Sequence, residues 1–419
     1  MIGNNDYLLL SRYDQALIGA PSIVRLFHYA YIPDVDRLRY TFQAALERFP
    51  RLATKIVNTG EGFRLAPLPL LPSVTLRGPL EWTLDQFSSE QLPQFINNLE
   101  TLPGRPVLIA SLTPVSRGAV LAISMSHSAG DGSSLNQFQK CWGELFAEAG
   151  SHFTVRATVD PVVGSGAKHS VCGQHSLGAE AIHRLNYLRQ MKRNLRVMKL
   201  DARFLDVLRK SLSTSDLVPT LNEALTAFLV HRYGQQLLDC ALGVRLRMPV
   251  DVRGIDARIG PSFVGNGFLE AVVPLDRLED DRAAARRTIR LIRTAVKQVR
   301  DLGYVASSIK SVDGHAYLDQ SELPPFEPKT DIVSTNLSQL TFNRVDFGGG
   351  PPVGYRCMLP APAGILIGPA ADGVQVHFAS ERDDLRIGER ERSDIWDGGD
   401  DAVAGTERSV SATRSVGEG

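Results

Sequence analysis

The stretch of sequence that decides the fold runs from Ala119 to Leu135 and reads AVLAISMSHSAGDGSSL. It opens with an apolar, partly β-branched run, Val120 to Ile123, which predicts a buried strand. The triplet Gly130-Asp131-Gly132 consists of turn formers and ends that strand region. His127 therefore lies at the mouth of a strand, in a segment that turns immediately afterwards.

The residues after the turn predict a helix. Ser134 is followed three residues later by Gln137, which is the pattern of a capping box, so we expect Ser134 to cap a helix that begins at Leu135. An imidazole at such a junction can be held rigidly while its backbone stays buried. Because histidine ionises near neutral pH, it suits general-base catalysis. The alternative is a hydrogen-bonded histidine with no chemical role, since H-x-x-x-D also arises by chance.

Length and composition are those of an ordinary globular enzyme. The chain has 419 residues, which suggests two similar halves, with 43% hydrophobic and 22% charged residues. Lys and Arg number 46, as do Asp and Glu, so the charge balance does not favour nucleic acid or an anionic membrane as a partner.

The four cysteines lie far apart, and no Cys/His group has the spacing of a metal site, so we expect no bound metal and reduced thiols. The N-terminus lacks the pattern of a secretory signal, and no apolar run is long enough to span a bilayer. We therefore expect a cytoplasmic protein without a transmembrane segment.

Periodicity predicts an α+β chain. Helices are expected at 34–49, 84–99, 135–149, 177–197, 202–211, 222–234 and 280–302. Strands are expected at 23–31, 52–57, 62–65, 107–113, 119–125, 241–252, 269–273, 332–336, 339–345, 365–369 and 373–379. Composition divides the chain into a first half (1–160), a crossover linker (161–200), a second half (201–395) and a disordered tail (396–419).

Several segments together resemble the BAHD acyltransferases, within the wider chloramphenicol-acetyltransferase-like clan. The first is SMSHSAGDGSSLNQFQKCWGEL, which is similar to the family's H-x-x-x-D-G region. Further segments resemble the family in the same order, between residues 5 and 380: LERFPRLATKI, LNEALTAFLV, MPVDVRGIDARIGPSFVGNGF and VDFGGGPP. H-x-x-x-D-G alone is a weak signal, but its combination with D-F-G-x-G about two hundred residues later is strong.

The resemblance implies two chloramphenicol-acetyltransferase-like subdomains, each a mixed sheet flanked by helices, with a tunnel between them. It implies an O- or N-acyltransferase that moves an acyl group from acyl-CoA, a co-substrate, to a small-molecule hydroxyl or amine. By the same resemblance, His127 and Asp131 would form the catalytic motif. His127 would be the base, no covalent enzyme intermediate would form, and no cofactor would be permanently bound. Asp131 would turn away and pair with an arginine.

The D-F-G-x-G segment is implied to support the structure. We expect Asp346 to pair with Arg253, and Gly348 and Gly350 to permit a tight turn. Position 349 carries glycine where the family has tryptophan, and this is expected to remove a wall of the active site.

Four residues are expected to serve substrate binding. Thr335 and Asn336 lie where the family carries Thr-Ser, and Asn336 would donate to the oxyanion. Gly130 and Gly132 would let the backbone approach the reacting centre.

Two alternatives remain open: an acyl carrier protein as the donor, and a non-catalytic homologue that binds a small molecule. A serine hydrolase is disfavoured because no G-x-S-x-G is present. We expect a monomer that acts in secondary metabolism.

Overall fold

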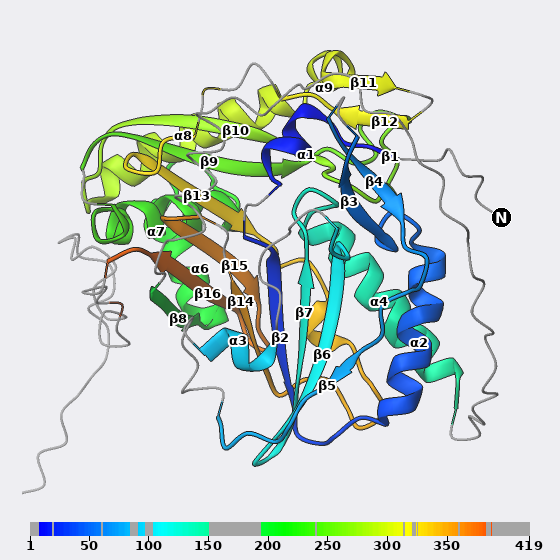
Figure 1. The fold of residues 1–419 in the computed structure, drawn as a ribbon. Helices are drawn as coiled ribbons and strands as arrows, with labels where there is room; N and C mark the ends of the chain where they lie inside the picture. The colour runs from blue at the N-terminus through cyan, green and yellow to red at the C-terminus, as the bar shows by residue number, and fades with distance from the viewer. Residues whose placement is uncertain are drawn as a thin grey trace, which may run out of the picture.

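The computed structural model describes residues 8–18, 21–59, 62–83, 91–96, 104–150, 194–238, 241–312, 315–320, 324, 326–358, 361–382 and 387. Two large β-sheets flanked by helices form most of this part of the chain (Figure 1). The fold class is α+β, as predicted. The expected disordered tail (396–419), and residues 161–193 of the expected linker, lie outside the described residues.

The first sheet has five strands in the order β14-β2-β7-β6-β5. Its strands are β2 (Ile23–Tyr29), β5 (Thr75–Leu76), β6 (Leu108–Val115), β7 (Gly118–Met125) and β14 (Gly354–Met358). A smaller sheet beside it has the order β1-β4-β3 and consists of β1 (Leu8–Leu9), β4 (Phe63–Pro67) and β3 (Thr54–Asn58). The predicted hairpin near residues 52–65 is confirmed.

Strand β7 is buried along almost its whole length because helices cover both faces of the first sheet. Leu121 and Ile123 join the core with α2 (Val35–Arg48) and α4 (Gly132–Glu148). Val120 and Ala122 point the other way, into a smaller core with α3 (Leu92–Phe95). Side chains alternate between the faces of a strand, so a continuous apolar run is what burial on both faces requires.

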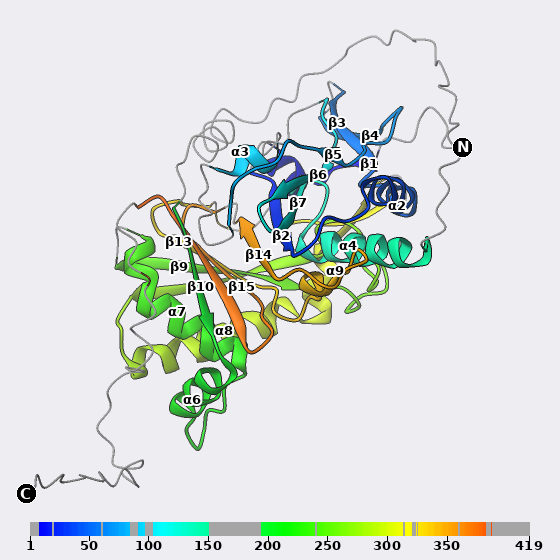
Figure 2. The same ribbon diagram turned by 90° about the horizontal axis from the view of Figure 1, so that it is seen from below.

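The second sheet has six strands in the order β10-β9-β13-β15-β16-β8. Its strands are β8 (Asn194–Leu200), β9 (Leu242–Asp251), β10 (Phe268–Arg277), β13 (Asp331–Asn336), β15 (Gly364–Pro369) and β16 (Val374–Ser380). It is covered by α6 (Ala202–Leu212), α7 (Leu221–Leu237) and α8 (Arg282–Val299), which Figure 2 shows gathered on one side of the sheet. After α8 come α9 (Leu302–Ser308) and a hairpin of β11 (Ile309–Val312) and β12 (His315–Leu318).

Helix α8 shows why a strongly basic segment packs as a helix. Ala285, Ile289 and Ile292 are buried in the second core at helical spacing, whereas Arg287, Arg290 and Arg293 are exposed. One of these, Arg293, pairs with Glu223 at 2.8 Å. The arginines of this helix therefore form the solvated face of an amphipathic helix.

The two halves share a strand. Strand β14 lies in the second half of the sequence, yet it pairs antiparallel with β2 in the first sheet. It also contacts the second sheet, because the Tyr355 hydroxyl donates to the carbonyl of Pro369 at 2.8 Å and Gln375 Nε2 donates to the carbonyl of Tyr355 at 3.2 Å. The simple division at residue 201 therefore misses one strand that crosses between the halves.

Two local predictions are wrong, and a third is confirmed in part. Residues 339–345 form a turn followed by the 3₁₀ helix η3 (Phe342–Arg344), not a strand. Residues 194–197, expected as the end of a helix within the linker, belong to β8, which pairs with β16. Of the helix expected at 84–99, residues 92–95 are helical and most of the others lie outside the described residues.

The loop from Asp346 to Gly350 is closed by its own aspartate and by Tyr31. Asp346 Oδ1 accepts hydrogen bonds from the backbone N–H groups of Gly348 at 2.7 Å and Gly350 at 2.9 Å. Both glycines have positive φ, +98° and +105° respectively, so the turn depends on them as expected. The Tyr31 hydroxyl donates to the carbonyl of Gly350 at 3.1 Å and accepts from the N–H of Phe347 at 3.1 Å.

We expected that glycine in place of tryptophan at position 349 removes a wall of the active site, and this expectation is wrong. The Tyr31 ring covers Gly349 so closely that an added Cβ would lie 2.6 Å from the ring. The loop packs on Phe146 near the end of α4, with the rings of Phe146 and Phe347 5.3 Å apart. Since a helix rises about 1.5 Å per residue, this contact lies about 22 Å from Asp131 at the other end of α4.

Replacing Gly349 by alanine should lower the free energy of unfolding by about 1–3 kcal/mol, because the new methyl group overlaps the packed Tyr31 ring. Urea unfolding followed by fluorescence measures this loss. Gly78→Ala is the matched control, since a Cβ there meets nothing within 4 Å. Equal stability of the two variants would contradict the tight packing of Tyr31.

Candidate active site

His127 lies in the turn that connects β7 to α4. Its side chain is half-buried, and its ring packs edge-on against Phe268, with ring centroids 6.1 Å apart. The Nδ1 atom is buried and has no hydrogen-bond partner. No carboxylate of the described residues lies within ion-pair or hydrogen-bonding distance of this ring, so His127 and Asp131 are not coupled directly.

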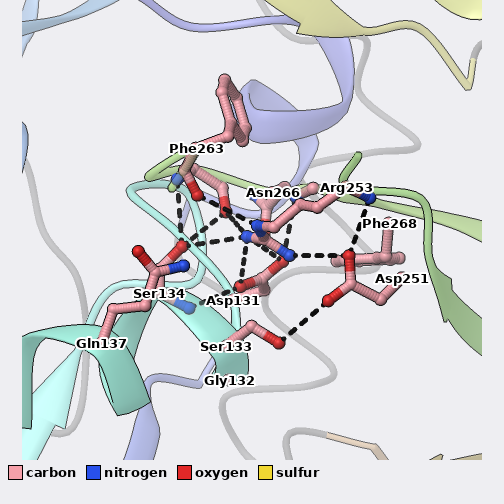
Figure 3. A network of polar contacts seen from close by, with 12 residues as sticks. Asp131, Gly132, Ser133, Ser134, Gln137, Asp251, Arg253, Phe263, Asn266 and Phe268 are labelled. Carbon is pink, nitrogen blue, oxygen red and sulfur yellow. Dashed lines mark hydrogen bonds and ion pairs between the residues drawn. The ribbon is translucent and has the colours of Figure 1, made fainter. Parts of the chain in front are cut away.

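Asp131 is instead held by Arg253, which comes from the second half of the chain (Figure 3). The guanidinium nitrogen NH2 of Arg253 lies 2.9 Å from Oδ1 and 2.8 Å from Oδ2 of Asp131. Both side chains are buried, with 5% and 9% of their surface exposed. The same nitrogen donates to the carbonyl of Gly265, and Nε donates to the carbonyl of Phe263, each at 3.0 Å. A buried carboxylate needs such a partner.

Asp131 is also the N-cap of α4. Its Oδ1 accepts from the N–H of Ser134 at 2.9 Å, and Oδ2 accepts from the N–H of Gly267 at 2.9 Å. The helix therefore begins at Gly132, and the predicted cap at Ser134, with a helix from residue 135, is wrong by three residues. Ser134 instead joins the halves, because its hydroxyl donates to the carbonyl of Gly265 at 2.8 Å.

The prediction that Arg253 pairs with Asp346 is wrong. The guanidinium of Arg253 is taken by Asp131 and Asp251, whereas Asp346 binds the backbone of its own loop. The arginine reaches Asp131 by passing directly over Gly267, where a Cβ would lie 2.4 Å from the guanidinium carbon. Gly267 is therefore required by the close approach of Arg253.

A second set of contacts holds the histidine turn through its backbone. Asn266 Nδ2 donates to the carbonyl of His127 at 2.8 Å, and Arg51 Nε donates to the carbonyl of Ala129 at 2.8 Å. Asp14 lies behind both residues, 2.7 Å from Asn266 and 3.4 Å from Arg51. Sequence reasoning did not select these three residues, although two of them lie within segments that resemble the family.

Gly130 and Gly132 flank the buried Asp131. A Cβ on Gly130 would lie 3.1 Å from Ser134, and one on Gly132 would lie 3.3 Å from Leu337. The contact with Leu337 brings the end of β13 next to the start of α4. The carbonyl of Gly132 accepts from the buried Arg25 at 2.9 Å.

Thr335 and Asn336 lie at the end of β13, immediately before Leu337. Asn336 Nδ2 donates to Asn222 Oδ1 at 2.6 Å, and its Oδ1 accepts from the N–H of Ser338 at 2.9 Å. The Asn336 amide is thus bound to the start of α7 and to its own turn. The structure brings this segment close to Gly132, and the role of Asn336 at an oxyanion stays a prediction.

Beside Phe268, the second half contributes a chain of buried charges. Arg247 contacts Glu270 at 2.7 Å and Asp331 at 2.7 Å. The Tyr13 hydroxyl donates to Glu270 at 3.1 Å, and its ring packs on Phe268 with centroids 5.7 Å apart. Burial, and then the charge of Glu270, raise the pKa of Tyr13 well above its usual value, so this hydroxyl keeps its proton.

The described residues lack both a metal-binding cluster and a membrane-spanning helix. They contain no group of three or more His, Cys, Asp or Glu side chains arranged to hold a metal ion. None of their helices is both long enough and apolar enough to cross a membrane.

A sequence model of the Transferase family matches residues 81–384. The chain belongs to this family, the BAHD acyltransferases. A comparison with curated proteins finds no match.

Several solved structures have the same fold as this chain. Vinorine synthase is 16% identical, with a TM-score of 0.61, over 91% of this chain and 92% of its own. F. sporotrichioides TRI101 complexed with Coenzyme A and T-2 is 16% identical, with a TM-score of 0.54, over 90% and 95%. The first condensation domain of the CDA synthetase is 14% identical, with a TM-score of 0.57, over 93% and 94%.

Replacing Arg253 by methionine should lower the free energy of unfolding by about 3–5 kcal/mol, because it leaves the buried Asp131 carboxylate without its cation. Chemical denaturation measures the loss. Arg209→Met is the control, since it breaks an exposed pair with Asp206 and should change little. The double variant Asp131→Asn/Arg253→Met should recover part of the stability, and no recovery would contradict the pairing.

Proposed function

We propose that this protein transfers an acyl group from a coenzyme A thioester to a hydroxyl or amine of a small molecule, with His127 as the general base. The observation that carries the proposal is the placement of His127. Its ring is only half-buried and has no carboxylate partner, whereas its backbone is fixed by contacts from both halves.

The reaction needs one proton carrier. An unprotonated ring nitrogen of His127 takes the proton of the acceptor O–H or N–H as the acceptor atom attacks the thioester carbonyl. The tetrahedral intermediate then collapses, the carbon–sulfur bond breaks, and the histidine returns the proton to the leaving thiolate. No bond forms between the acyl group and the protein, and no permanently bound cofactor or metal takes part.

Asp131 serves this chemistry by holding the turn. Its two oxygens accept hydrogen bonds from Arg253, Ser134 and Gly267, which leaves it no position on the histidine ring. In this proposal the aspartate of the H-x-x-x-D motif is a positioning residue. Its partner Arg253 ties the turn to the second half of the chain.

Substrate contacts are proposed at the junction of α4 and β13. Gly130 and Gly132 present backbone next to the histidine turn, and Thr335 and Asn336 lie where Leu337 reaches Gly132. Asn336 still carries a second amide hydrogen beyond the one given to Asn222. An oxyanion that forms on the thioester carbonyl would accept from such donors, in a tunnel between the halves.

A coenzyme A donor is favoured because the family is acyl-CoA-dependent. TRI101, which shares the fold, has been solved with Coenzyme A bound. We propose further that the protein acts as a cytoplasmic monomer in secondary metabolism.

Replacing His127 by glutamine should lower turnover by about 10²–10⁴-fold, because glutamine cannot accept and return a proton. Release of free thiol from acyl-CoA in the presence of alcohols or amines, above the acceptor-free rate, measures this. His28→Gln is the matched control, since His28 lies on β2 and bonds the carbonyl of Arg117. Parental turnover by the His127 variant would rule out the base assignment.

The donor class is tested by offering the same acyl group on coenzyme A and on an acyl carrier protein. We expect turnover with the free thioester, since a small donor needs no protein-docking surface. The assay compares initial rates of ester or amide formation by mass spectrometry. Turnover only with the carrier protein would assign the alternative donor, and binding of acyl-CoA without any turnover would favour the non-catalytic alternative.

A further inference from the structure

The side-chain amide of Asn266 has its orientation fixed by two acceptors. Its Nδ2 donates to Asp14 Oδ1 at 2.7 Å and to the carbonyl of His127 at 2.8 Å. Both partners can only accept in these contacts, so the nitrogen faces them and cannot exchange places with Oδ1. Asn266 is 6% exposed, which means that water does not compete for these bonds.

Asp14 makes this orientation costly to change. It is 3% exposed, and its Oδ2 accepts from the N–H of Ser11 at 3.1 Å and lies 3.4 Å from Arg51. The bond from Ser11 belongs to a capping box at the start of α1 (Arg12–Ala16). The carboxylate is thus held in place by its own helix, and it holds the amide of Asn266 in turn.

Two polar atoms remain without partners next to these contacts. Asn266 Oδ1 and His127 Nδ1 are both buried and both lack a hydrogen bond, although the two residues already touch through Nδ2 and the histidine carbonyl. A buried amide oxygen can only accept, and a neutral imidazole carries one N–H. The two unsatisfied atoms are therefore a complementary acceptor and donor, and leaving each unpaired would be costly.

We propose that Asn266 is a positioning residue that selects the tautomer of His127. Its Oδ1 accepts the Nδ1–H of the imidazole through one bridging water molecule, and so leaves Nε2 unprotonated as the base. Asp14 fixes the amide that does this. The inference rests on the proposed function, because the choice of tautomer matters only if His127 takes a proton.

The two hydrogen bonds from Nδ2 give a further consequence. A carboxylate at position 266 would place negative oxygen against Asp14 and against the carbonyl of His127, so Asn266→Asp should disrupt both contacts. Adding Asp14→Asn restores a donor for the first contact only, since the histidine carbonyl still faces a carboxylate. Stability and catalysis should therefore respond differently to the second substitution.

Kinetics of the full-length protein test the proposal first. Asn266→Ala should lower kcat by about 10-fold to 100-fold, which is part of what a general base contributes, and should leave KM within about twofold. In the Asp14→Asn/Asn266→Asp variant, the melting temperature should recover relative to Asn266→Asp while kcat stays low. A kcat that simply follows the melting temperature across the series would overturn the proposal.

The control removes a helix cap elsewhere. Asp201 caps α6 by accepting from the N–H of Phe204 at 2.7 Å, so Asp201→Ala costs stability of a similar kind without contacting the histidine turn. It should keep the parental kcat. If Asn266→Ala fails to fold, Asp14→Asn takes its place in the comparison, because it keeps the side-chain volume. Asp14→Asn should also lower kcat.

The tautomer itself is read by NMR without any substrate. The protein is labelled with ¹⁵N-histidine and measured at pH 8. The signals of His127 are those that are lost in His127→Gln. Their two-bond ¹⁵N–¹H coupling pattern should show the Nδ1–H tautomer. In Asn266→Ala the Nε2–H form should increase. An Nε2–H form in the parent, or no change in the variant, would overturn the proposal. Because this measurement needs no turnover, it remains readable if acyl transfer itself is not found.

Discussion

The ion pair between Asp131 and Arg253 is the contact on which the site depends. It joins the first residue before α4 to the segment that follows β9, so each half of the chain supplies one charge. Burying either side chain without its partner would cost several kcal/mol of folding free energy, because an unpaired ion loses its hydration. The conformation of the histidine turn therefore depends on the packing of the two halves against each other. Ser134 and Gly265 reinforce the same junction with hydrogen bonds in both directions.

Strand β14 also makes the first half depend on the second, because it pairs with β2 in the first sheet. With β14 paired to β2 and contacting β16 through side chains, the first sheet is incomplete until residues 354–358 have arrived. The end of β13 then places Leu337 next to Gly132, at the start of α4. The histidine turn is thus held by segments that are distant in sequence. Its geometry comes from tertiary packing rather than from the H-x-x-x-D stretch itself.

This explains which features the sequence could predict. Helix α2 and the hairpin of β15 and β16 follow from periodicity, which is a local property. The pairing of Asp131 with an arginine came from the family resemblance, but its identification as Arg253 did not, because two aspartates competed for one arginine. Tyr31 over Gly349 could not be foreseen either. A glycine shows that a side chain is missing, but not which distant ring fills the space.

The absence of a carboxylate on the histidine ring fits the chemistry of a thioester. A serine protease expels an amine and uses an aspartate to stabilise the imidazolium that must protonate it. A thiolate is a far better leaving group, since thiols ionise near pH 8.5, so its departure needs less help from a strong acid. A neutral amide acceptor such as Asn266 can select the tautomer without stabilising the imidazolium as a carboxylate would. In the proposed reaction the histidine only takes and returns a proton, and Asp131 joins the two halves instead of contacting the imidazole.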